Sequence, residues 1–343
     1  MSLRLRNPLN LLRSHAIALD AGSGRTIITT PESEVLLDEP TFIAIEHGTG
    51  AVIAIGTEAK SYLGKAPERI QVIRPIQAGV ITDFDSAKAL LRAFFKRISP
   101  DDGSRLKICA VVSFGITELE KRTFADCCKA AGAGKVDLVD APLAAAVGAG
   151  LDIRQPRGRL MLGIGAGLAE ASVLCLADVV FNETAPLGAE IFHEAVAQHL
   201  AARYRVSIGE NMAEQATLQL AWAERPAEPR SMTLTGKYSG SGTPCALELT
   251  DADLEGALDG PLNALEALVR KAMDKTPAEL VADIADTGLT LYGGGSQVHG
   301  LDSALGARLG LRTRLTQEPG LVAVLGAAAT LRPDLDFKKL LVK

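Results

Sequence analysis

The chain has 343 residues, of which 47% are hydrophobic and 22% are charged, and its formal net charge is −5. A chain of this length and composition can bury a sizeable core and usually divides into two or more compact units. The acidic balance argues against a nucleic-acid partner, because phosphate binding needs an excess of Lys and Arg on one face. The five cysteines show no CxxC spacing, which favours reduced thiols in a cytoplasm.

The first 14 residues interleave leucines with arginines around Pro8. We expect neither export nor a membrane span, because this segment lacks a signal-peptide core and no later stretch is a charge-free span. Such a segment could still lie in a membrane interface, with arginines at anionic headgroups, or it could be a frayed tail. The candidate membrane-contacting residues are Leu3, Leu5, Leu9, Leu11 and Leu12.

Residues 15–30 contain two β-branched stretches around the turn AGSG, which predicts a tight β-hairpin. Two strands at FIAI and AVIAI and a helix at 58–63 are expected next. Asp83 opens a long amphipathic helix. After the buried strand KICAVVSF, Thr117 and Glu120 have the spacing of a capping box that starts another helix. The strand KVDLV and the small-residue helix APLAAAVGAG follow.

The pattern of strand, glycine turn and strand returns at Leu160 in LMLGIGAGLAEASVL, so the chain contains an internal duplication. Residues 224–243 are rich in Pro, Gly and Ser, which predicts a surface excursion with short strands. One long helix is expected from Asp251 through Met273. The other predicted elements are a strand at DVVFNETAP, helices over 190–204 and 211–222, a helix opened by Pro277, the buried strand GLTLY before the cluster GGGS, and a last helix over 320–331.

Two glycine turns that each follow a buried strand suit a nucleotide held between two similar lobes. Glycine lets backbone N–H groups approach phosphate oxygens that a Cβ atom would block. One such turn is weak evidence, since most glycine turns only reverse the chain. The third cluster, at 293–295 directly after an apolar strand, makes the pattern specific.

Seven segments resemble, in order and spacing, those of the MreB bacterial actins, from about Ala16 to about Ala329. They are IALDAGSGRT, DEPTFIAI, IRPIQAGVITDF, FGITELEKR, APLAAAVGAGL, KTPAELVADI and LYGGGSQVHGLD. The resemblance implies an α/β protein with the actin-like fold, in which two duplicated RNase H-like lobes surround an ATP cleft. The implied boundaries are a tail at 1–14, a first lobe at 15–150 with a small subdomain at about 31–80, a second lobe at 151–331 with a small subdomain at about 205–270, and a tail at 332–343.

In that family the two glycine turns are phosphate loops and GGGS is the adenosine loop. The resemblance therefore implies ATP as the ligand, with magnesium held weakly through Asp20. The nucleotide-binding residues that it implies are Asp20, Gly22, Ser23, Gly24, Arg25, Gly165, Ala166, Gly167, Gly188, Glu214, Gly293, Gly294, Gly295 and Ser296.

The departures from the family concern hydrolysis. Gly163 stands where the family has a second aspartate, and Leu168 and Ala169 replace threonines that donate to phosphate. Ala141 stands where a glutamate positions the attacking water, and a methyl group cannot accept a proton. Asp140, one residue earlier, lies on a different side of the chain. We therefore assign no catalytic residue and expect weak or absent hydrolysis.

Further from the phosphates, Ala189 replaces the acid after Gly188, and Thr217 replaces the basic residue expected three positions after Glu214. These losses leave open a packed lobe interface without a ligand. The retained glycines favour nucleotide binding instead, because an abandoned loop has no steric reason to stay free of Cβ atoms.

Three functions remain open. A filament-forming cytoskeletal protein is favoured, because the actin fold assembles head to tail; a pseudo-enzyme adaptor of another actin-like filament is the first alternative. A sugar-kinase-type phosphotransferase would need a general base that the alanines remove. Expected partners are further copies of the chain, other bacterial actins, cell-shape membrane proteins and an anionic membrane, in the cytoplasm at the inner face of the membrane. The loop SPDDGSR is polar where the family often has an apolar one, so only the amino terminus is left to contact a bilayer.

Overall fold

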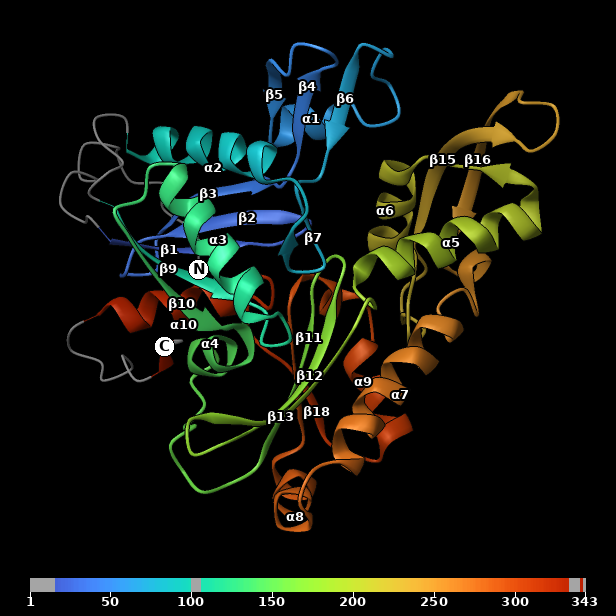
Figure 1. Cartoon of the computed structure of the whole chain (residues 1–343). Helices are drawn as coiled ribbons and strands as arrows, with labels where there is room; N and C mark the ends of the chain where they lie inside the picture. The colour runs from blue at the N-terminus through green and yellow to red at the C-terminus, as the bar shows by residue number, and fades with distance from the viewer. Residues whose placement is uncertain (1–15, 100–105, 333–339, 342–343) are drawn as a thin grey trace. The chain divides into compact units, whose positions relative to one another are not determined.

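The computed structural model describes residues 16–99, 106–332 and 340–341. The chain forms two compact units, each with a five-stranded mixed sheet and helices packed on it (Figure 1). The first unit contains the described residues within 1–60, 69–148 and 323–343, and the second contains 61–68 and 149–322.

The sheet of the first unit has the strand order β10-β9-β1-β2-β3. Its strands are β1 (Ala16–Ala21), β2 (Arg25–Thr29), β3 (Val35–Pro40), β9 (Lys107–Val112) and β10 (Lys135–Asp140). β1 pairs antiparallel with β2 and parallel with β9, so the predicted hairpin at 15–30 is confirmed. Smaller strands form a three-stranded sheet and a two-stranded ribbon: β4 (Ile43–Glu46), β5 (Val52–Ile55), β6 (Ile70–Ile73), β7 (Ile76–Gln77) and β8 (Val80–Ile81).

Helices cover both faces of this sheet. α2 (Phe84–Ile98) and α3 (Glu118–Ala130) share one core with Ile108 and Ala110 of β9. Cys109, between those two residues, faces the other side, where its Sγ atom lies 3.1 Å from the Thr330 hydroxyl on α10 (Val322–Leu331). The short helices α1 (Thr57–Ser61) and α4 (Ala141–Gly148) complete the set. Alternation along one buried strand therefore places a helical layer on each face.

The helix starts predicted in this unit are confirmed. The Asp83 carboxylate accepts a hydrogen bond from the Ser86 N–H and caps α2. Thr117 and Glu120 form both hydrogen bonds of the capping box at the start of α3. Short polar side chains satisfy N–H groups that the first helical turn leaves unpaired.

The sheet of the second unit has the strand order β13-β12-β11-β17-β18. Its strands are β11 (Arg159–Ile164), β12 (Ala169–Cys175), β13 (Asp178–Ala185), β17 (Leu289–Tyr292) and β18 (Thr313–Leu315). β11 and β12 pair antiparallel, which confirms the second predicted hairpin, and β11 pairs parallel with β17. The chain thus repeats the strand pairing of the first unit.

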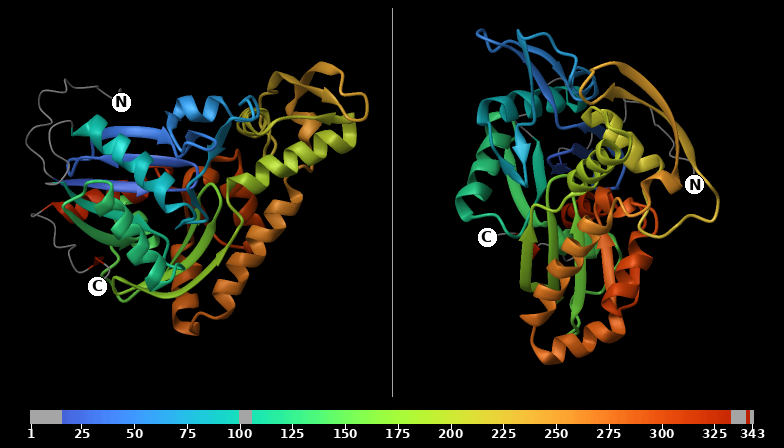
Figure 2. Two further views of the ribbon diagram at one scale, coloured as in Figure 1. Left: turned by 45° about the horizontal axis from the view of Figure 1, so that its top comes forward. Right: turned by 90° about the vertical axis from the view of Figure 1, so that its right-hand side faces the viewer.

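Helices of the second unit bury the face that carries Leu160, Leu162 and Leu291. They are α5 (Ala189–Tyr204), α6 (Glu210–Gln219), α7 (Asp259–Asp274), α8 (Ala278–Thr287) and α9 (Leu301–Leu309). The predicted excursion is the hairpin β15 (Ser231–Tyr238) and β16 (Pro244–Thr250), joined by β14 (Val206–Ser207). α6 packs against α5 and β15 (Figure 2).

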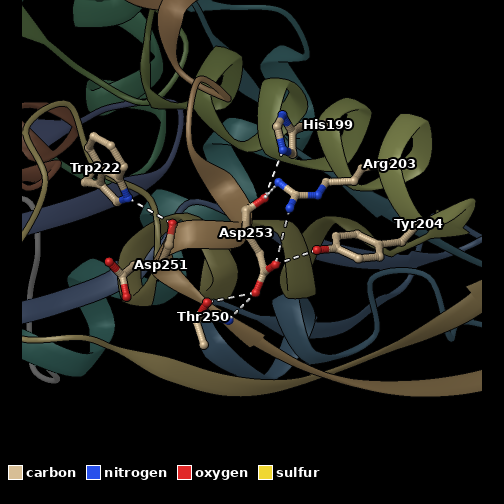
Figure 3. Close-up of polar contacts among 7 residues, drawn as sticks. All are labelled: His199, Arg203, Tyr204, Trp222, Thr250, Asp251 and Asp253. Carbon is tan, nitrogen blue, oxygen red and sulfur yellow. Dashed lines mark hydrogen bonds and ion pairs between the residues drawn. The ribbon is translucent and has the colours of Figure 1, made fainter.

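The predicted single helix from Asp251 through Met273 is wrong at its start. Residues Asp251–Leu254 form a 3-10 turn, and α7 begins only at Asp259. Gly256, at φ +76°, interrupts the two elements. Asp253 closes the short turn, since its carboxylate accepts from the Thr250 N–H and hydroxyl at 2.8 and 2.9 Å and from the Tyr204 hydroxyl (Figure 3). The capping box thus stabilises the start of this turn, and the positive φ of Gly256 separates the turn from α7.

No helix among the described residues has the length and apolar character needed to span a bilayer. The five leucines predicted to contact a membrane, from Leu3 to Leu12, lie outside the described residues.

Candidate functional site

The first glycine loop joins β1 to β2 in the first unit. The Gly22 N–H donates to the Arg25 carbonyl at 2.9 Å, and the Gly24 carbonyl accepts from the Thr41 N–H at 3.1 Å. Ser23, which lies between these two glycines in the chain, is buried. The Arg25 guanidinium pairs with Asp38 on β3, its Nε atom lying 2.9 Å from one carboxylate oxygen. Arg25 thus has a partner within the sheet, and its contact with nucleotide stays a prediction.

Asp20 lies next to this loop, near the carboxyl end of β1. Burial raises the pKa of its carboxyl group to about 6, against the opposing effect of the Arg25 charge. A desolvated carboxylate gains from a nearby cation, because the cation favours the charged form. Asp20 is therefore suited to a metal or to another cationic group, and its contact with magnesium stays a prediction.

The second glycine loop is held by the start of α5 in the second unit. The N–H groups of Ala189 and Glu190 donate to the carbonyls of Gly165 and Ala166, at 2.8 and 2.9 Å. Gly188 caps the helix, and a Cβ atom added there would lie 2.2 Å from the Ala166 oxygen. The loop and the helix are thus joined through backbone groups, and the position of one fixes the other.

The cluster GGGS forms a 3-10 turn, Gly294–Gln297, against the end of β11. Gly293 has φ +89°, and a Cβ atom there would lie 2.4 Å from the Ile164 oxygen. A Cβ atom on Gly295 would lie 2.5 Å from the Ile164 side chain. The buried Ser296 hydroxyl donates to the Gly293 carbonyl at 2.6 Å. The structure thus brings the second loop, Gly188 and this turn together.

These contacts divide the glycines of the loops into two kinds. At Gly188, Gly293 and Gly295 a side chain would strike neighbouring atoms, so packing within the unit already explains them. Packing does not explain Gly22, Gly165 or Gly294, where an added Cβ atom would meet nothing closer than 3.5 Å, 3.4 Å and 4 Å respectively. Only Gly22, Gly165 and Gly294 among these glycines therefore leave room at the backbone for a ligand.

Glu214 and Thr217 lie on α6. Thr217 is buried, and its hydroxyl donates to the Ala213 carbonyl at 2.8 Å within the helix. Glu214 is half-buried. The position where a basic residue was expected is thus used for packing.

Gly163 lies in β11 between Glu170 of β12 and Tyr292 of β17. A Cβ atom added at Gly163 would lie 2.3 Å from Cζ of Tyr292 and 2.5 Å from its hydroxyl oxygen. Tyr292 is 5% exposed, so its ring fills the space into which a side chain at position 163 would extend. A second carboxylate does not fit there, and these residues do not form a two-carboxylate magnesium site. The sequence analysis found Gly163 but missed Tyr292 and Glu170.

Asp140 ends β10 directly before Ala141, the first residue of α4. The Asp140 carboxylate lies 3.7 Å from the Lys121 ammonium, and these residues are 8% and 9% exposed. Lys121 also lies 3.3 Å from the exposed Glu118. A buried charge needs a partner, so this pair has a structural role. Lys121 could not be identified from the sequence, because a lysine in the motif ELEKR gives no signal of burial.

A family model described as MreB/Mbl protein matches residues 14–338. The chain belongs to the MreB/Mbl family. It is 30% identical to the cell shape-determining protein MreB of Escherichia coli (strain K12) over 324 residues, which cover 93% of each chain.

Solved structures agree with this family and with the predicted actin-like fold, which is confirmed. The crystal structure of MreB5 of Spiroplasma citri bound to ADP has a TM-score of 0.87 and 25% identity, covering 92% of this chain and 95% of that one. The same values hold for MreB5 bound to AMPPNP. A MamK double helical filament shares the fold, with a TM-score of 0.75, 17% identity and coverage of 92% and 98%.

Two features of this MreB/Mbl chain lie next to its glycine loops and to α4. The Tyr292 ring lies against Gly163 at the end of β11, and α4 begins with Ala141. Backbone hydrogen bonds join the second loop to α5, and the 293–296 turn packs closely against Ile164 and Gly165. The second loop is thus ordered in this chain although residues 141 and 163 carry no acidic side chain.

Proposed function

We propose that the chain is a filament-forming, actin-like cytoskeletal protein that binds adenine nucleotide and hydrolyses it slowly or not at all. Its family includes cell shape-determining proteins, and we assign it a role in cell shape or in positioning structures inside the cell. The observation that carries the slow hydrolysis is the Tyr292 ring against Gly163, directly before the second glycine turn.

Nucleotide binding is supported by the relatives and by the free space around three glycines. MreB5 of Spiroplasma citri has been solved with ADP and with AMPPNP. Gly22, Gly165 and Gly294 lack a side chain at positions where packing would admit one. Close approach of a ligand to the backbone is a physical reason for a glycine at such positions in a loop that follows a buried strand.

Slow hydrolysis follows from the residues around the phosphate loops. Phosphoryl transfer depends on positioning the water and on neutralising charge as it develops. Ala141 offers no proton acceptor, and the adjacent Asp140 carboxylate is paired with Lys121. When bound, magnesium would supply charge neutralisation, and Asp20 is the residue we assign to it.

Filament formation is proposed because repeated contact between two different patches of one chain generates an open polymer. The degenerate site also favours the second candidate, an adaptor that binds another actin-like filament without polymerising alone. An adaptor has no need of turnover.

Sedimentation and calorimetry test these proposals together. We expect purified protein to pellet at high speed in the presence of ATP, and ATP titration to release or absorb heat. Absence of a pellet with ATP, together with co-sedimentation on a bacterial actin filament, would support the adaptor. Absence of heat at high protein concentration, with and without Mg²⁺, would contradict nucleotide binding.

A further inference from the structure

Tyr292 and Gly163 lie side by side at the carboxyl ends of two parallel strands, β17 and β11. Leu160, Leu162 and Leu291 alternate to the opposite face, where the helices bury them. Thr290, one register step back, is paired with Met161 on the same face as Tyr292. The tyrosine ring therefore stands at the end of the strand pair, immediately before Ile164 and Gly293 begin the two glycine turns.

The ring is fixed in this place by its burial and by the absence of a side chain opposite. Tyr292 is 5% exposed, and its ring carbons reach within 2.8 Å of the position where a Cβ atom of residue 163 would be. Glycine weakens a strand, and an aromatic ring laid across it from the neighbouring strand restores buried area. Each residue of this pair is thus suited to the other, and changing one alone creates a clash or a cavity.

We propose that Tyr292 sets the cation requirement of nucleotide binding in this chain. Its ring excludes a carboxylate from position 163 and leaves a phenol there, beside the buried Glu170 that pairs with Gly163 from β12. Mg²⁺ is a hard cation that is held by carboxylates and phosphates, and a neutral phenol is not among its preferred ligands. The ligand class is therefore an adenine nucleotide whose binding depends only weakly on a divalent cation, with Asp20 as the one acid assigned to that cation. The inference rests on the nucleotide binding proposed above.

A cycle of variants separates the steric effect from the charge. Gly163→Ala adds only a methyl group, and Gly163→Asp adds a methylene and a carboxylate at the same place. Both should lower the midpoint of thermal unfolding by about 3–10 °C without nucleotide, because the ring must move in a packed interior. Combining either change with Tyr292→Ala should recover part of that loss. Tyr292→Phe keeps the ring and should behave like the wild type.

Calorimetric titrations with ATP, in Mg²⁺ and in EDTA, then measure how far ATP affinity depends on the cation. Wild type, Gly163→Ala/Tyr292→Ala and Tyr292→Phe should bind ATP with similar affinity in both buffers. Gly163→Asp/Tyr292→Ala should bind more tightly with Mg²⁺, by on the order of tenfold, since it gains an acid near the metal. The aspartate and alanine doubles differ only in the carboxylate, so each is the control for the other.

Each outcome bears on one of the two proposals. Wild-type binding that requires Mg²⁺ would overturn the assignment to Tyr292 while supporting nucleotide binding, and this comparison needs no variant to fold. The assignment to Tyr292 would also be overturned if the single variant Gly163→Asp, without Tyr292→Ala, had the thermal midpoint of the wild type and bound ATP more tightly with Mg²⁺. Absence of ATP binding by every variant would overturn the proposed nucleotide binding and the cation assignment with it.

Discussion

At residue 141 the chain places a methyl group directly after the buried ion pair of Asp140 and Lys121. We expect Ala141→Glu to raise the rate of phosphate release from ATP, because a carboxylate there could orient and deprotonate the attacking water. A general base commonly contributes a factor on the order of 10²–10⁴, and the gain here should lie at the low end because position 163 stays neutral. Phosphate release would be followed at equal protein concentration, with polymer mass measured in parallel.

The result that would contradict this prediction concerns Asp140, the acid next to Ala141. Wild-type turnover that matches an ordinary bacterial actin and does not respond to Ala141→Glu would show that Asp140 or another residue orients the water. Asp140→Asn is a poor test of turnover alone, since it removes the buried carboxylate beside Lys121 and leaves only the exposed Glu118 as an acidic partner. Breaking a buried pair costs about 3–5 kcal/mol, so its unfolding must be measured beside its activity. Adding Gly163→Asp to Ala141→Glu should help only when Tyr292 is also reduced to Ala.

Asp253 gives a pH-dependent prediction. Hydrogen bonds from the Tyr204 hydroxyl, the Thr250 N–H and the Thr250 hydroxyl hold the pKa of its carboxyl below the usual range (Figure 3). The folded-state pKa is the lower one, so the stabilisation is present above the unfolded pKa of about 4 and is lost as the pH falls through the folded value. Asp253→Asn should therefore lower the free energy of unfolding by about 1–2 kcal/mol at pH 7, and by less at acid pH.

Urea unfolding at pH 7 and at pH 3 measures this difference. Glu255→Gln is the control, because Glu255 is exposed and lies in the same segment, so it loses a charge without losing these hydrogen bonds. A penalty for Asp253→Asn that is equal at both pH values would show that shape, and not the ionised carboxylate, stabilises the turn.

Among the elements, α5 and α6 offer a matched pair of glycine caps. Gly188 begins α5 with an Ala166 oxygen at 2.2 Å from its absent Cβ atom, whereas Gly209 begins α6 with nothing within 4 Å, and neither has a positive φ. We expect Gly188→Ala to destabilise the protein by about 1–3 kcal/mol and to weaken ATP binding, because α5 and the second loop must separate. Gly209→Ala should leave ATP affinity unchanged. Equal affinity of the two variants would show that the loop does not need its contact with α5.

The same elements show how far sequence alone could predict this fold. Both glycine hairpins, the Asp83 cap and the Thr117 capping box were predictable, because each depends on neighbours within a few residues. The start of α7 was not, because the turn around Asp253 depends on Tyr204, which lies 49 residues away. Tyr292 was missed for a similar reason, since only the parallel pairing of β11 with β17 places it over Gly163. Local sequence signals were therefore enough to predict the glycine loops, whereas the side chain that packs against Gly163 depends on pairing between distant strands.

For the whole molecule, membrane attachment is a prediction about residues 1–13, which lie outside the described part of the chain. We expect the full chain to float with anionic vesicles and a version lacking these residues to stay in the soluble fraction. Each arginine near an anionic surface contributes about 1 kcal/mol, so single chains bind weakly and a polymer multiplies the effect. A version with the five leucines changed to serine keeps the arginines and separates insertion from charge. Equal flotation of all three proteins would rule the segment out.

Polymer assembly should depend on the presence of nucleotide but hardly on its hydrolysis. A nucleotide state can bias a polymer only through a difference in affinity between assembled and free chains, and hydrolysis is what changes that state with time. With Ala141 and the Gly163–Tyr292 pair in place, chains that bind ATP should keep it. We therefore expect equal polymer mass and equal persistence with ATP and with AMPPNP, measured by light scattering and sedimentation over hours. Ala141→Glu is the matched variant, and its polymer should decay in ATP but persist in AMPPNP. Wild-type polymer that disassembles in ATP while persisting in AMPPNP would show efficient turnover and contradict the proposed slow hydrolysis.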